Sequence, residues 1–180
     1  MTMQGYNLLI SVPRHFERDA KAEFWLLCSA LGDTMPLTKE VGISGLILGK
    51  TRYQPKDFIA KVIQFKQQHS YWQFFYLLKM IPLDRIVESE LEVIVDVFRG
   101  LIHEAKFNPH VKFKIEVKER ESKKLKSEII IKLAELLQNP VDLDNPDIIL
   151  RVEFLGRYCG LSILNPEQIV SLSEGVTIQV

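Results

Sequence analysis

The basic side chains of this sequence concentrate between residues 112 and 126. That segment holds seven lysines or arginines against three acids, whereas residues 127–180 hold three bases against eight acids. The zero net charge of the whole chain therefore hides a local positive patch, and local clustering decides whether a surface attracts a polyanion. We expect this patch to bind the phosphates of a nucleic acid. The candidate contacts are Lys112, Lys114, Lys118, Arg120, Lys123, Lys124, Lys126 and Arg157.

Three of these lysines, Lys123, Lys124 and Lys126, lie in the first turn of a predicted helix. Apolar residues recur at helical spacing over 125–137, and Ser122 is a suitable N-cap. The start of a helix is partly positive, so each cation there costs about 0.3–1 kcal/mol, whereas a phosphate is attracted. The arrangement favours a phosphate site. The alternative is a charged turn that only water solvates.

Two arginines complete the candidate surface. Arg120 follows the predicted lysine-rich strand, and Arg157 lies between Gly156 and Gly160, where little can shield it. A guanidinium group can bind a phosphate through two hydrogen bonds or stack on an unpaired base. For each arginine the alternative is a surface ion pair.

The patterns that support catalysis are missing from the sequence. There is no GxGxxG cofactor loop and no zinc-deaminase signature, and Gly49-Lys50-Thr51 is only the tail of a Walker loop. The four histidines lack the spacing of metal ligands, and the aspartates at 142, 144 and 147 are typical of a turn. We therefore expect no catalytic residue, no metal and no cofactor, and we predict that the chain is not an enzyme.

Residues 1–82 have the element order of a ferredoxin-like βαββαβ domain, with two helices on one face of an antiparallel sheet. Alternating apolar residues indicate strands, and apolar residues three or four apart indicate helices. The last strand is dense in aromatic residues, which predicts a buried strand; the alternative is a platform on which bases stack. The predicted elements are strand 6–12, helix 16–31, strands 35–40 and 42–48, a helix that begins near Pro55, and strand 71–80.

Residues 83–180 predict a second domain of mixed α/β structure. Residues 82–90 form the expected connection, where Ser89 and Glu92 fit a capping box. In strand 111–118 the odd-numbered side chains are apolar, while Lys112, Lys114, Glu116 and Lys118 are expected to face solvent. The other predicted elements are a helix with apolar residues from Leu91 to Ala105 that ends near Phe107-Asn108-Pro109, the lysine-capped helix, two strands between 148 and 164, and a last helix ending near 172.

The order of features from Val87 to Leu172 resembles the THUMP domain. The alternating strand leads into the basic turn and the amphipathic helix, then into Val141-Asp142-Leu143 and Pro146-Asp147, and finally into a strand that closes with Gly160-Leu-Ser162-Ile-Leu164. No single motif among these is unique, and the ordered set carries the resemblance. It implies an RNA-binding module that recognises tRNA near its acceptor and 3′ end.

A ferredoxin-like domain followed directly by a THUMP domain is the arrangement of THUMP proteins, in which an enzyme domain normally follows. The two predicted domains use the whole sequence, so it resembles the stand-alone THUMP adaptor required for N4-acetylcytidine formation in tRNA. This implies tRNA and a separate tRNA acetyltransferase as partners. The alternative is a protein-interaction scaffold whose basic face docks an acidic partner.

Composition places the protein in a cytoplasmic, soluble class. The 47% hydrophobic content is enough for packed cores, and no apolar run approaches the roughly 20 residues that cross a bilayer. The N-terminus lacks the pattern of a secretion signal. The two cysteines, Cys28 and Cys159, are expected to be buried and reduced.

Overall fold

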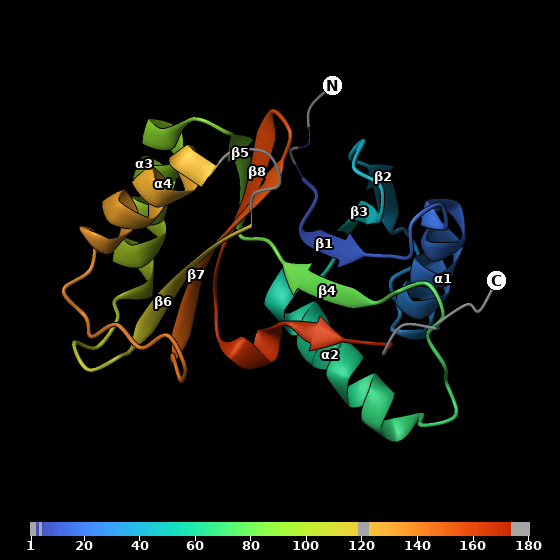
Figure 1. The fold of residues 1–180 in the computed structure, drawn as a ribbon. Helices are drawn as coiled ribbons and strands as arrows, with labels where there is room; N and C mark the ends of the chain where they lie inside the picture. Colours follow the sequence, from blue (N-terminus) through green and yellow to red (C-terminus); the bar gives the residue numbers. More distant parts are fainter. Residues whose placement is uncertain (1–2, 4, 119–122, 174–180) are drawn as a thin grey trace. The chain divides into compact units, whose positions relative to one another are not determined.

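The computed structural model describes residues 3, 5–118 and 123–173, except the side chains of Lys123 and Lys124, and it divides into two compact units. Residues 5–83 form one unit together with residues 168–173, and residues 84–167 form the other. Both units combine a sheet with helices (Figure 1), as predicted for an α+β protein.

The first unit has an antiparallel sheet in the strand order β2-β3-β1-β4-β9. Both of its helices pack on the sheet through a common apolar core. The order β2-β3-β1-β4 is that of a ferredoxin-like βαββαβ domain, so this prediction is confirmed. The elements are β1 Leu8–Ser11, α1 Glu17–Ala30, β2 Leu37–Glu40, β3 Leu46–Lys50, α2 Pro55–Gln68, β4 Lys79–Pro82 and β9 Val170–Ser171.

Close packing of α1 on β3 depends on a glycine in the strand. A Cβ atom on Gly49 would lie 2.9 Å from the ring of Phe24 and 3.0 Å from a terminal methyl of Ile10, closer than such atoms normally approach. Phe24 and Ile10 are both fully buried. The helix can therefore rest directly on the backbone of the strand, which brings the end of α1 beside the end of β3.

The predicted aromatic strand 71–80 is wrong over most of its length. The chain forms a loop there, and β4 begins only at Lys79. Glu23 on α1 explains the loop, because its carboxylate accepts hydrogen bonds from the N–H groups of Phe75, Tyr76 and Leu77 at 2.7–2.8 Å. These donors are therefore not available to a sheet. Tyr71 is 77% exposed and Phe75 50% exposed, so the aromatic residues are not uniformly buried.

The end of the described chain returns to the first unit. A short 3-10 turn, Pro166–Gln168, leads into β9, which pairs with β4 in antiparallel register. The side chains of Val170 and Leu172 are buried in the core of the first unit, which explains the return. The predicted last helix is therefore wrong. The predicted second domain, 83–180, includes a segment that the structure assigns to the other unit.

The second unit has a sheet in the order β5-β8-β7-β6, in which β6 and β7 are parallel and the other pairs antiparallel. Helices α3 and α4 lie side by side over one face of this sheet (Figure 1). The elements are β5 Arg85–Glu88, α3 Leu91–Ala105, β6 Phe113–Lys118, α4 Lys123–Ala134, β7 Ile148–Leu155 and β8 Tyr158–Leu164.

Strand β5 was not predicted, because it lies in the segment expected to be a connection. It pairs with β8, and the hydroxyl of Ser89 just after it donates a hydrogen bond to the carbonyl of Gly156 at 3.0 Å. The Ser89 hydroxyl is therefore bonded to the turn between β7 and β8. Glu90 is the N-cap of α3 and makes no side-chain cap bond, so the predicted capping box is wrong.

We expect Glu23→Gln to destabilise the first unit by about 1–3 kcal/mol, because an amide nitrogen would face backbone N–H donors and leave one of them without an acceptor. Asp19→Asn, in the same helix, removes the same charge from an exposed side chain and serves as the control. Urea denaturation of the two variants gives the comparison. Equal stability of the two variants would contradict the role of Glu23.

Candidate nucleic-acid interface

The face of β6 that carries lysine is a partly buried charge network. Phe113 and Val117 pack under α3 and α4, so the alternate side chains of Lys114 and Glu116 lie on the opposite face of the sheet. The parallel register places Arg151 of β7 beside Glu116. The side chains of Lys114 and Glu116 are only 22% and 23% exposed.

Arg151 holds this network together. Its guanidinium group contacts Glu116 on one side and donates to Glu153 at 2.7 Å on the other, and Lys114 lies 2.8 Å from Glu116. Arg151 and Glu153 are 7% and 8% exposed. The expectation of a solvent-exposed lysine face is therefore wrong for Lys114, because its ammonium group pairs with Glu116, which Arg151 of β7 also contacts.

The pKa of the Glu116 carboxyl reflects the same contacts. Burial acts to raise its pKa, but the hydrogen bond from Lys114 and the positive charges of Arg151, Lys114 and Lys118 outweigh burial. The pKa is lowered from its ordinary value, so the carboxylate stays ionised and the network stays paired at neutral pH.

Lys112 is also paired, at the end of the sheet. Its ammonium group lies 2.9 Å from Asp142, and its N–H donates to Asp147 at 2.8 Å. Asp142 in turn accepts from the N–H groups of Asp144 and Asn145 at 3.1 and 2.8 Å, which lowers the pKa of its carboxyl together with Lys112. The prediction of a turn built by these aspartates is confirmed.

The start of α4 places three predicted contacts together. The helix begins at Lys123 and has no acidic residue in its first turn, so Lys123, Lys124 and Lys126 share that turn. Lys126 and Lys118 are exposed. Arg120 and Ser122 lie outside the described residues. This turn is therefore placed at a helix start, where backbone N–H groups can bind a phosphate.

Arg157 lies in the turn between β7 and β8, where its side chain is 78% exposed. It forms an ion pair with Glu88 at 3.1 Å and lies over the ring of Tyr158. A surface ion pair was the alternative that the sequence left open for Arg157. An exposed pair is worth only about 0–1 kcal/mol, so a phosphate could replace Glu88 at little cost.

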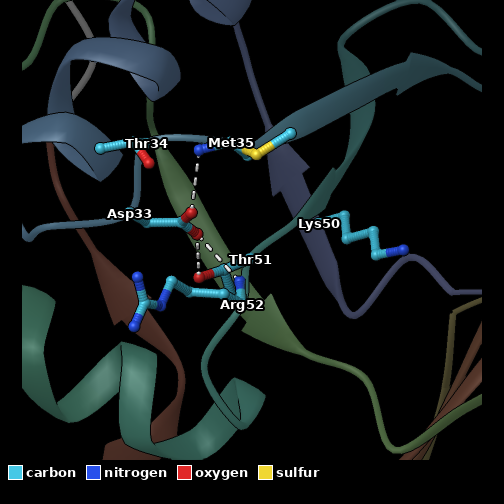
Figure 2. A pocket seen from close by; sticks show the side chains of 6 residues that line it. All are labelled: Asp33, Thr34, Met35, Lys50, Thr51 and Arg52. Carbon is cyan, nitrogen blue, oxygen red and sulfur yellow. Dashed lines mark hydrogen bonds between the residues drawn. The ribbon is translucent and has the colours of Figure 1, made fainter.

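A second cationic surface lies in the first unit and was not predicted from the sequence. Residues 50–61 hold four bases and one acid, but this excess of positive charge is smaller than that of residues 112–126. The loop after α1 and the loop after β3 enclose a cavity of about 330 Å³ there (Figure 2). It is lined by Asp33, Thr34, Met35, Lys50, Thr51 and Arg52.

Asp33 fixes the shape of this cavity. Its carboxylate is 1% exposed and accepts hydrogen bonds from the Thr51 hydroxyl at 2.7 Å, the Arg52 N–H at 2.9 Å and the Met35 N–H at 3.2 Å. Burial acts to raise the pKa of Asp33, but these bonds and the charge of Arg52 outweigh it and lower the pKa. The carboxylate is thus a structural anchor of the two loops.

The described residues contain no group of three or more histidines, cysteines or acids that could hold a metal ion. Both cysteines are free and buried, as predicted, and burial raises the pKa of Cys159 to about 12. Burial also raises the pKa of Cys28, so both thiols are protonated at neutral pH. Across the same residues, no helix is long and apolar enough to cross a membrane.

Residues 88–164 match the model of the THUMP domain family, so this part of the chain is a THUMP domain. The matched segment starts at the end of β5 and stops at the end of β8. It therefore includes both helices and most of the sheet of the second unit. No curated protein matches the chain significantly.

Three solved structures share the fold at low sequence identity. PH1313 from Pyrococcus horikoshii Ot3 aligns with a TM-score of 0.61 and 20% identity over 92% of this chain and 55% of its own. A 4-thiouridine synthetase in complex with RNA and ATP gives 0.57 and 18%, over 92% and 42%. TrmN from Thermus thermophilus gives 0.54 and 13%, over 89% and 46%. The chain thus spans about half the length of these proteins.

We expect Arg151→Leu to destabilise the protein by about 3–5 kcal/mol at neutral pH, because Glu116 and Glu153 would stay buried without their shared cation. The ordinary pKa of a glutamate is 4.5, and the lowered pKa of Glu116 stabilises the protein at pH values above it. This contribution is lost as the pH falls. In the variant the pKa of Glu116 is raised, so protonation of Glu116 removes the cost of its buried charge.

The difference in unfolding free energy between the Arg151→Leu variant and the unmodified chain should therefore shrink from pH 7 towards about pH 4. Arg151→Lys keeps the charge and serves as the control. A loss that is the same at both pH values would contradict the ionic origin of the effect.

Proposed function

We propose that this protein binds tRNA at its acceptor and 3′ end through the THUMP domain. The single observation that supports this best is the first turn of α4, which has three lysines and no acid within the matched THUMP segment. The N–H groups of a helix start and ammonium groups both attract anions, and an RNA supplies such anions as phosphates.

The pairing of the other candidate lysines assigns them different roles in this proposal. Lys112 and Lys114 are held by Asp142 and Glu116, so they stabilise the domain and contribute less to RNA affinity. Lys118 and Lys126 are exposed and can reach an RNA phosphate directly. Arg157 can exchange its exposed carboxylate partner for a phosphate.

We further propose that the protein acts without catalysis of its own and presents tRNA to a separate enzyme, an N4-cytidine acetyltransferase. The absence of a cofactor loop from the sequence supports this, and so does the resemblance to the stand-alone THUMP adaptor. Binding a tRNA end at a fixed position would raise the local concentration of the target nucleotide at the partner enzyme.

We expect replacement of Lys123, Lys124 and Lys126 by Ala to weaken tRNA binding and to leave stability unchanged or slightly raised, because cations at a helix start are unfavourable. A gel-shift titration at moderate salt measures the first effect, and thermal unfolding measures the second. Arg99→Ala with Lys132→Ala removes exposed, paired cations and is the control. Unchanged tRNA affinity in the triple variant would rule out this site.

We also expect tRNA that lacks its single-stranded 3′ end to bind more weakly than intact tRNA. If the basic surface served only to dock an acidic protein, its affinity for tRNA would not depend on the 3′ end. The comparison therefore separates RNA recognition from the scaffold alternative. Affinity should fall steeply with salt, because binding releases counterions from the phosphates. Equal affinity for both RNAs would contradict end recognition.

Purified protein incubated with unmodified tRNA and acetyl-CoA, S-adenosylmethionine or ATP should produce no modified nucleoside. The reaction that contains acetyl-CoA should produce N4-acetylcytidine once a tRNA acetyltransferase is added, and nucleoside mass spectrometry detects it. A nucleoside modified by this chain alone would contradict the adaptor proposal.

A further inference from the structure

Three cations of the first unit surround one rigid part of its surface. Tyr53 is fixed by a hydrogen bond from its hydroxyl to the carbonyl of Leu31 at 2.8 Å. The ammonium of Lys61 lies 5.0 Å from the centre of the Tyr53 ring, and the guanidinium of Arg52 lies 5.5 Å from it. Lys50 lines the neighbouring cavity. The three side chains thus belong to one surface, which we call the Lys50–Lys61 surface.

The backbone beneath this surface is held at several points. The side chain of Asn7 donates to the carbonyls of Thr51 and Tyr53 at 3.1 and 3.3 Å and accepts from the Thr51 N–H at 3.1 Å. Asp33 binds the same segment from the other side. A ligand would therefore meet cations on a preformed support, which limits the entropy lost on binding.

Lys50, Arg52 and Lys61 differ from the cations of the second unit in their ion pairs. In the part of the chain that the structure describes, Lys50, Arg52 and Lys61 have no carboxylate within ion-pair distance. Lys112 and Arg157 in the second unit do have such partners. Even with the charge of Asp33 included, the surface keeps an excess of positive charge, and it attracts anions.

The directions of the side chains indicate an extended anion. Lys50 and Arg52 point to opposite sides of the Asp33–Thr51 centre (Figure 2), so they do not converge on one point. A single phosphate could not contact both. Successive phosphates along a strand could, and the cavity of about 330 Å³ between the two residues leaves space for a sugar or base.

We propose that the Lys50–Lys61 surface binds consecutive phosphates of an RNA strand and is a second RNA contact, separate from the start of α4. The proposal rests on the tRNA binding proposed above. The contact is to the backbone and carries no sequence specificity, because cations on phosphates position an RNA but do not read its bases.

The test replaces Lys50, Arg52 and Lys61 by Gln in the full chain. The control variant replaces Lys21, Lys66 and Arg99 by Gln and makes the same change of net charge on other surfaces. Affinity for tRNA is measured for both variants and the unmodified chain between about 50 and 200 mM salt. Circular dichroism and thermal unfolding establish that the variants are folded.

We expect the first variant to bind tRNA roughly tenfold or more weakly at low salt, with a salt dependence whose log–log slope is smaller by about 2, as for three lost phosphate contacts. The control variant should keep the slope of the unmodified chain. Inorganic phosphate at matched ionic strength should leave the difference in affinity between the two variants unchanged, because one phosphate cannot span the diverging cations.

Equal affinity and slope in the two variants would overturn this proposal while leaving the tRNA-binding function intact. Loss of that difference in the presence of inorganic phosphate would also overturn it, because the site would then take a single anion. If the unmodified chain binds no tRNA, both the proposed function and this second contact are wrong.

Discussion

The parallel pairing of β6 with β7 is the constraint on which the rest of the THUMP unit depends. Parallel neighbours cannot be joined by a tight turn, so the chain must cross over the sheet between them. Helix α4 makes this crossing and buries Ile129 and Leu133 against the sheet. The start of α4, with its lysines, therefore lies just after the end of β6.

The same pairing determines which charges remain available to a ligand. Because β7 runs beside β6, Arg151 lies next to Glu116 and joins a network with Lys114 and Glu153. These charges satisfy one another at low exposure, where an unpaired charge would be costly. Lys126, which lies beyond the end of β6, is exposed. Strand register thus separates the paired cations of the sheet from this exposed cation, which is proposed to bind RNA.

The first unit shows how single carboxylates organise loops. Glu23 holds the backbone of the aromatic loop, and Asp33 joins the end of α1 to the segment after β3. Each of the two carboxylates accepts three hydrogen bonds. Asp33 in this way supports the cationic segment without neutralising it, and a net attraction for anions remains on the surface around Arg52 and Lys61.

The sequence by itself determined the βαββαβ order, the limits of α1 and α3 to within a few residues, the start of α2 and the lysine-rich helix start, because periodicity and local charge are properties of neighbouring residues. Tertiary structure alone decided the partner of Lys112, which lies 30 residues away, and it placed Arg151 of β7 beside the local pair of Lys114 and Glu116. It also decided that residues 71–78 form a loop and that β9 joins the first sheet, because Glu23 and β4 are distant in sequence. Long-range hydrogen bonds and ion pairs leave no periodic signal in the chain.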